Sequence, residues 1–183
     1  EIHYLKTDDA EGEFKCFAKR DFGIEYSLVH HGDNWLISTN ENAVDFKVMS
    51  TKIGFEGKEN WQEYMPHQEG RMIDSVTSFK NHIFIGFKER ARERLKVISN
   101  NGESHEIVFP ENVASFGLGS NLEYDTEVVR LGYSSPISPY SVFDYHISER
   151  RLETKKVQEI PSGYDKSKYD CDLIQLIYYC LTT

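Results

Sequence analysis

The residues of this sequence best suited to acid–base catalysis or metal binding are its seven histidines. They are His3, His30, His31, His67, His82, His105 and His146. Imidazole titrates near neutral pH and is a common metal ligand. Adjacent residues of a strand point to opposite faces, so the neighbouring pair at 30 and 31 cannot chelate one ion without another segment. We therefore predict hydrogen-bonded or solvated histidines, with no metal site and no cofactor.

A serine nucleophile is the second chemistry to consider, at Ser134 and Ser135. A hydrolase of the α/β class needs G-x-S-x-G, a strained turn that exposes the serine oxygen. The sequence contains no such motif, since GLGSN at 117–121 and GYSSP at 132–136 do not fit. Neither serine has a base within its local pattern. Both are interpreted as capping residues of a proline turn, and no catalytic residue is predicted.

Five cations alternate along one short stretch. They are Lys88, Arg90, Arg92, Arg94 and Lys96. On one extended strand they would share a face and could bind phosphate or an acidic peptide. The favoured interpretation is a solvated hairpin in which Glu89 and Glu93 balance the charge.

Charge and cysteine content limit the partners and the compartment. The sequence has 30 acidic and 21 basic side chains and a net charge of −9, which disfavours binding to nucleic acid. No apolar run is long enough to cross a membrane, so no membrane role is expected. Cys16, Cys171 and Cys180 are an odd number without CxxC spacing, which indicates neither a disulfide framework nor a zinc site. A cytoplasmic location suits such free thiols.

The elements that carry these residues are predicted to be strands. Aromatic residues make up 13% of the sequence and lie with β-branched residues in short runs separated by Gly, Asn and Asp. This pattern predicts an all-β fold. The clearest runs are 25–31, 34–39, 44–50, 82–87, 94–99, 105–109, 126–133 and 141–147.

The strand-like runs also repeat. FKVMS begins at residue 46, LKVIS at 95 and FDYHIS at 143, so the starts lie 49 and 48 residues apart. Each is preceded and followed by further strand-like runs, which gives consecutive four-stranded meanders. IHYLK and EFKCFA near the start form part of one more. We predict a partial β-propeller of about three four-stranded antiparallel blades plus part of another, in preference to a β-sandwich.

The repeat predicts a hairpin in a stretch whose local propensity favours a helix. KERARERLK at 88–96 consists of good helix formers, but the equivalent stretch of the previous repeat is a turn between strands. A hairpin is therefore predicted there.

Trp35 and Trp61 lie in predicted strands and are interpreted as residues that pack blades together, rather than as a ligand-stacking pair.

The order of these segments resembles the propeller domain of oligopeptidase B, or protease II, in the prolyl oligopeptidase family of serine peptidases. The strongest pieces are RLGYSS at 130–135, the strand at 139–145 and GYDKSKY at 163–169, and the likeness runs from about residue 25 to about residue 169. The resemblance implies a seven-bladed propeller joined to an α/β-hydrolase domain that holds the catalytic Ser, Asp and His. It also implies cleavage of peptides after Arg or Lys.

The resemblance divides the chain into three parts. Residues 1–160 correspond to the carboxy-terminal half of the family's propeller, 161–170 to the interdomain linker, and 171–183 to a tail that does not match the family. The candidate linker residues are Pro161, Gly163, Tyr164 and Tyr169. Proline fixes one backbone angle and glycine frees another, which suits a hinge, although an ordinary loop is an equal alternative.

The function implied is that of a truncated, non-catalytic propeller fragment, in which the propeller restricts substrate access. Its partners would be the missing hydrolase domain of the same enzyme and, in the whole enzyme, peptide substrates. We expect the chain alone to be inactive. The alternative is a stand-alone propeller module that binds a protein or peptide. In either case, open blade edges predict self-association.

Overall fold

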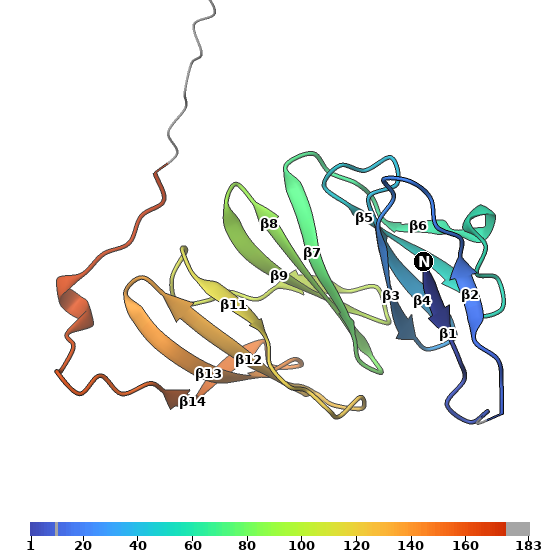
Figure 1. Ribbon diagram of the computed structural model, residues 1–183. Coiled ribbons are helices and arrows are strands. Elements are labelled where there is room, and N and C mark those ends of the chain that lie inside the picture. The colour runs from blue at the N-terminus through green and yellow to red at the C-terminus, as the bar shows by residue number, and fades with distance from the viewer. Residues whose placement is uncertain (10, 175–183) are drawn as a thin grey trace, which may run out of the picture. The chain divides into compact units, whose positions relative to one another are not determined.

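The computed structural model describes residues 1–9 and 11–174, and within them it confirms an all-β fold built from repeated sheets (Figure 1). One two-stranded and three four-stranded antiparallel sheets are present in this part of the chain. In each four-stranded sheet consecutive strands are neighbours, as in the blades of a propeller. The predicted partial propeller, with three blades and part of another, is therefore confirmed.

The chain divides into two compact units. Among the described residues, the N-terminal unit comprises 1–107 and 122–126, and the C-terminal unit comprises 108–121 and 127–174. The sheets of the N-terminal unit contain β1 (Ile2–Tyr4) and β2 (Lys15–Ala18); β3 (Tyr26–His31), β4 (Asn34–Thr39), β5 (Lys47–Lys52) and β6 (Gln62–Met65); and β7 (Arg71–Ser78), β8 (His82–Glu89), β9 (Arg92–Ser99) and β10 (Ser104–Glu106). The C-terminal unit contains β11 (Ser115–Leu118), β12 (Val128–Ser135), β13 (Ser138–His146) and β14 (Arg151–Val157). Two short 3₁₀ helices are η1 (Lys58–Asn60) and η2 (Lys166–Lys168).

The repeat predicted from the sequence is the repeat of the sheets. FKVMS, LKVIS and FDYHIS lie on β5, β9 and β13, which are the third strands of the three meanders. Two predicted runs each include three residues that lie outside the observed strand. The run at 44–50 becomes a strand only from Lys47, because a turn with positive φ at Asn42 and Phe46 precedes it. The run at 105–109 ends as a strand at Glu106.

The stretch at 88–96 is a hairpin, as the repeat predicts. Arg90 and Ala91 form its two-residue turn and have φ of 51° and 58°. A two-residue turn with both residues in the left-handed region matches the right-handed twist of the flanking strands. Tertiary pairing thus outweighs the local helical propensity.

The hairpin turn excludes the less favoured alternative, in which five cations share one face of a single strand. Arg90 lies in the turn, Lys88 pairs opposite Glu93, and Glu89 pairs opposite Arg92. Residues directly opposite each other share a face, and successive residues alternate between faces. Lys88 and Arg92 therefore point to opposite faces of the sheet, and no five-cation surface exists.

The core of the N-terminal unit lies on both faces of β4. Leu36 faces the sheet β7–β10 and packs with Ile83 and Ile85, whereas Ile37 faces the β1–β2 ribbon and packs with Phe17. A strand covered on both faces reads as continuously apolar rather than alternating, as NWLIST does. Successive sheets of this unit are therefore joined by apolar side chains from alternate residues of one strand.

The C-terminal unit has one apolar and one charged face. Val129, Leu131 and Tyr133 alternate along β12 and are fully or almost fully buried. The opposite face carries an ion-pair network across β12, β13 and β14. Its contacts are Arg130 to Asp144 at 2.8 Å, Lys155 to Glu153 at 2.9 Å and His146 to Glu153 at 2.9 Å.

This network makes the C-terminal unit sensitive to acid. Hydrogen bonds from Lys155 and then from His146 lower the pKa of Glu153 from its ordinary 4.5 to about 2. The unfolded chain takes up the proton first, so this stabilisation is complete above about pH 4.5 and is lost as the pH falls towards about 2. We expect the melting temperature of the unit to depend less on pH in this window in Glu153→Gln than in the wild type. Glu159→Gln, at an exposed carboxylate outside the network, is the control, and an unchanged slope in Glu153→Gln would contradict the prediction.

Candidate functional site

His31 forms a hydrogen-bonded clamp between two sheets of the N-terminal unit. Its Nδ1 lies 2.8 Å from Ser78 Oγ on β7, and its Nε2 lies 2.8 Å from Asn100 Oδ1 after β9. The Asn100 amide donates to the Lys80 carbonyl at 3.1 Å, which directs its oxygen towards His31. An amide oxygen only accepts, so Nε2 carries the proton and Nδ1 accepts from the Ser78 hydroxyl.

In nucleophilic catalysis, too, a serine is hydrogen-bonded to a histidine, and a third residue orients the histidine. Here, however, Ser78 is the last residue of β7 and pairs opposite Ile83 of β8, rather than lying on a sharp exposed turn. The geometry therefore supports a structural link between sheets. It confirms the prediction of a satisfied side chain for His31. The neighbouring His30 points elsewhere, with its ring 5.6 Å from that of Trp35.

Removing the clamp is expected to weaken the N-terminal unit. His31→Leu leaves Ser78 and Asn100 without their shared partner, and the expected loss in free energy of unfolding is about 1–3 kcal/mol. Urea unfolding followed by tryptophan fluorescence measures it, because both tryptophans lie in this unit. The control His30→Leu removes an exposed ring and should have a smaller effect. Equal effects of the two substitutions would argue against the clamp.

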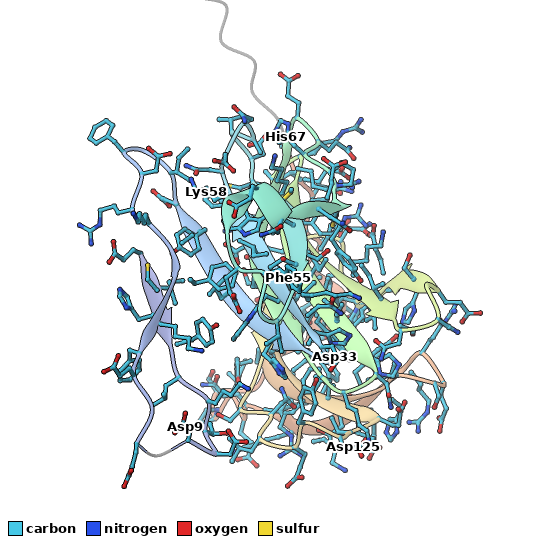
Figure 2. All side chains as sticks on the ribbon, turned by 90° about the vertical axis from the view of Figure 1, so that its right-hand side faces the viewer. Asp9, Asp33, Phe55, Lys58, His67 and Asp125 are labelled. Atoms are coloured by element: carbon cyan, nitrogen blue, oxygen red, sulfur yellow. The ribbon has the colours of Figure 1, made fainter. Side chains whose placement is uncertain are left out.

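Hydrogen bonds and an ion pair hold the segment 122–126 against the end of the N-terminal unit that carries the His31 clamp. Figure 2 shows Asp33 and Asp125 at this end. The Lys80 N–H donates to the Tyr124 carbonyl at 2.9 Å, and Lys80 Nζ lies 2.6 Å from Asp125. The Gly32 N–H reaches the Tyr124 hydroxyl at 3.5 Å. These contacts explain why a segment that follows β11 belongs to the N-terminal unit.

An open groove of about 580 Å³ runs along β2 and the segment after it. Its other wall is the β5–β6 connection, including η1, where Lys58 lies on the face seen in Figure 2. Lys58 pairs with Asp21 at 3.4 Å and with Glu41 at 3.1 Å. The positive charge of Lys58 on this wall is therefore balanced by two carboxylates. The lining residues of the groove are Cys16, Phe17, Ala18, Lys19, Arg20, Asp21, Glu56, Gly57, Lys58 and Glu59.

Glu56 joins this groove to the aromatic core behind it. Its Oε1 accepts from the Tyr4 hydroxyl at 2.8 Å and from the Gly54 N–H at 2.7 Å. Burial, and then the contact with Glu56, raise the pKa of Tyr4 to about 12. Burial acts to raise the pKa of Glu56, but the hydrogen bonds from Gly54 and Tyr4 prevail and lower it. The pair is thus a neutral phenol on a carboxylate, which positions a loop rather than transferring a proton.

The serines and tryptophans singled out in the sequence have packing or turn roles. Ser135 Oγ accepts from the Ile137 N–H at 3.2 Å, which confirms turn capping for this residue. Ser134 pairs opposite Ser115 in the ladder between β11 and β12. Trp35 and Trp61 belong to the aromatic core of the N-terminal unit, which confirms packing. The expected position of Trp61 within a strand is wrong, since it lies just before β6.

The four candidate linker residues lie close together and are exposed. Pro161 and Gly163 belong to one turn, in which the Gly163 N–H donates to the Ile160 carbonyl at 3.0 Å and Gly163 has a φ of 76°. The rings of Tyr164 and Tyr169 are stacked, with centroids 5.8 Å apart. A linker function for this segment stays a prediction.

A carboxylate that the sequence analysis missed holds this exit segment against the C-terminal unit. Glu111 is 10% exposed, and its Oε1 accepts from Ser138 Oγ at 3.0 Å and contacts Lys166 Nζ of η2. Its Oε2 is buried and has no hydrogen-bond partner among the described residues. No local motif marks Glu111, because Lys166 is 55 positions away in the sequence.

Metal-binding side chains converge at one place within the described ranges, on Glu1, His3 and Cys16. Cys171 is a free thiol, whereas Cys180 and most of the unmatched tail at 171–183 lie outside the described residues. No helix among the residues that the structure describes has the length and apolar character needed to cross a bilayer.

Comparison with known proteins identifies relatives over nearly the whole chain. The family described as "Prolyl oligopeptidase, N-terminal beta-propeller domain" matches residues 1–158. The chain is 29% identical to dipeptidyl aminopeptidase BI of Pseudoxanthomonas mexicana over 159 residues, which is 86% of this chain and 22% of that protein. It is 26% identical to protease 2 of Moraxella lacunata over 170 residues, which is 92% of this chain and 24% of that protein.

Solved structures show the same fold. Oligopeptidase B from Trypanosoma brucei with covalently bound antipain, in the closed form, superimposes with a TM-score of 0.84 at 21% identity and covers 93% of this chain. Oligopeptidase B from Leishmania major gives 0.81 at 22% identity and covers 92%. The matches span 26% and 25% of those two chains. This chain thus spans about a quarter of the length of its relatives.

Proposed function

Since this chain belongs to the prolyl oligopeptidase family through its N-terminal β-propeller domain, we propose that it is a non-catalytic part of the propeller of a serine peptidase. The peptidase cleaves peptides after Arg or Lys, and the propeller restricts which substrates reach its active site. The observation that carries the proposal is the match of residues 1–158 to the family's propeller domain. The consecutive four-stranded sheets in this range agree with it.

Two further observations support a role in a peptidase. The relatives named above are a dipeptidyl aminopeptidase, a protease and two oligopeptidases B, and one of the latter holds covalently bound antipain. The sequence itself has no G-x-S-x-G motif, and the Ser78–His31 pair is a link between strands. Catalysis is therefore assigned to a hydrolase domain outside these 183 residues, and cytoplasm is the proposed location.

The exit segment supports a connection between domains. The turn at Pro161–Gly163 follows the last strand, and Lys166 beyond it contacts Glu111 of the same unit. We propose that residues 161–170 join the propeller to the hydrolase domain, with Pro161, Gly163, Tyr164 and Tyr169 as linker residues.

Peptidase assays test the proposal. The purified chain alone should not hydrolyse chromogenic peptides that end in Arg or Lys, whereas the longer protein that contains it should cleave them with sensitivity to serine inhibitors. Peptides ending in Leu or Pro are the matched controls for specificity. Serine-inhibitor-sensitive cleavage by the chain alone would overturn the non-catalytic role. Preference of the longer protein for Pro would overturn the Arg/Lys specificity alone.

Self-association of the isolated chain stays a prediction. Among the described residues, β14 is the outermost strand of the last sheet and pairs with β13 on one side, so its other edge could pair with a second copy. The charged face of that sheet offers polar rather than apolar surface to a second copy. Light scattering that shows a dimer which dissociates in urea before unfolding would support pairing of edges, and a monodisperse monomer would contradict it.

A further inference from the structure

The β1–β2 ribbon presents three potential metal ligands on one face. His3 pairs directly opposite Cys16 across the ribbon, so both side chains lie on the same face. Tyr4 and Phe17, the next residues on each strand, point the other way into the aromatic core. Glu1 lies just before β1, and its carboxylate contacts the His3 ring on the face that carries Cys16.

The ligand atoms are close enough to share one ion. His3 Nε2 lies 3.0 Å from Glu1 Oε1, and the ligand atoms of all three residues lie within 4.8 Å of one another. Zinc bonds of about 2.0–2.3 Å in tetrahedral geometry require ligand atoms roughly 3.5 Å apart. Small rotations of exposed side chains are sufficient to reach that spacing.

Other contacts hold the ribbon in this register. The Tyr26 hydroxyl accepts from the Ile2 N–H and donates to the Ala18 carbonyl, each at 2.8 Å, and so connects both strands beside the ligands. The second oxygen of Glu1 accepts from the Arg20 N–H at 3.4 Å. The three ligands are therefore placed by contacts that do not depend on a metal ion.

We propose that Glu1, His3 and Cys16 bind a zinc-class divalent ion, with water in the fourth position. Thiolate and imidazole ligands favour Zn²⁺ and Co²⁺, while Mg²⁺ and Ca²⁺ require more oxygen ligands than this set offers. Binding replaces the His3–Glu1 hydrogen bond by two metal–ligand bonds. The His3 ring moves its proton from Nε2 to Nδ1 through solvent, and the Cys16 thiol releases its proton to solvent. All three side chains are exposed, so the ion exchanges readily with the medium.

The ion would also stabilise the ribbon. A two-stranded sheet is marginal by itself, and a metal that joins β1 to β2 binds only the folded state. We therefore expect Zn²⁺ to raise the melting temperature followed by tryptophan fluorescence. Mg²⁺ at the same concentration should have no effect.

Cobalt titration of the full chain is the direct test. The wild type should develop the thiolate-to-cobalt charge-transfer band, and Zn²⁺ should displace the signal at one equivalent. Cys16→Ser should abolish the band and weaken zinc binding by at least about 100-fold, and His3→Gln should weaken it by a similar factor. Cys171→Ser is the matched control, since it removes an equally free thiol of the chain and should bind as the wild type does.

The outcomes separate a site from accidental binding. Circular dichroism of Cys16→Ser shows whether the fold is intact, so lost binding in a folded variant supports the site. Absence of the charge-transfer band in the wild type, or equal zinc affinity of wild type and Cys16→Ser, would overturn it. Loss of binding in Cys171→Ser would place the ion elsewhere and would also overturn it.

Discussion

Phe17→Ala is expected to lower the free energy of unfolding of the N-terminal unit by about 3–5 kcal/mol. Phe17 is 2% exposed, and its ring lies 5.7 Å from Trp35 and 6.0 Å from Trp61. Truncation removes these contacts and leaves a cavity that rigid neighbouring rings cannot fill. Since a domain is stable by only about 5–15 kcal/mol, the loss is a large part of the total.

The tryptophans make this prediction easy to measure. Both contact Phe17, so their fluorescence reports the region that the substitution changes. Phe22→Ala is the matched control, because Phe22 is fully exposed and five positions away. Its effect should stay within about 0.5 kcal/mol. Similar urea midpoints for the two variants would show that the aromatic core does not stabilise the unit.

Lys166→Met is expected to have the second largest effect, a loss of about 2 kcal/mol from the C-terminal unit. The methionine keeps most of the side-chain length but leaves the Glu111 carboxylate with the Ser138 hydroxyl as its remaining partner within the described part of the chain. An unpaired charge at a 10% exposed position costs more than the ion pair itself contributes. Half of the Lys166 side chain is exposed, which keeps the figure below that of a fully buried pair.

A double variant identifies the cause. Glu111→Leu together with Lys166→Met removes both charges, and we expect it to regain most of the lost stability. Hydrogen exchange of residues 108–121 and 161–170 measures the effect locally. Lys168→Met is the control, because the Lys168 side chain is 73% exposed and contacts only Asp165 at 3.8 Å among the described residues. Faster exchange in the double variant than in Lys166→Met would contradict the prediction.

Much of the fold could be read from the sequence because local patterns repeat. The recurring apolar alternation in FKVMS, LKVIS and FDYHIS predicts the third strand of each sheet. The position of residues 88–96 within the repeat also predicts the hairpin there, although these residues favour a helix locally. The less favoured alternative, a single-faced stripe of cations, is excluded for a related reason. Alternation places side chains on one face only while a strand continues, and the turn at Arg90 reverses the chain.

The sequence alone thus determined the all-β repeat, the resemblance to one peptidase family and the absence of its nucleophile motif. The tertiary structure decided which polar residues meet. His31 finds partners 47 and 69 positions away, and Glu111 meets Lys166 across 55. His3 and Cys16 lack any spacing motif, yet strand pairing sets them side by side. Periodicity records which face a residue occupies, whereas the partner on that face depends on how distant strands pair and pack.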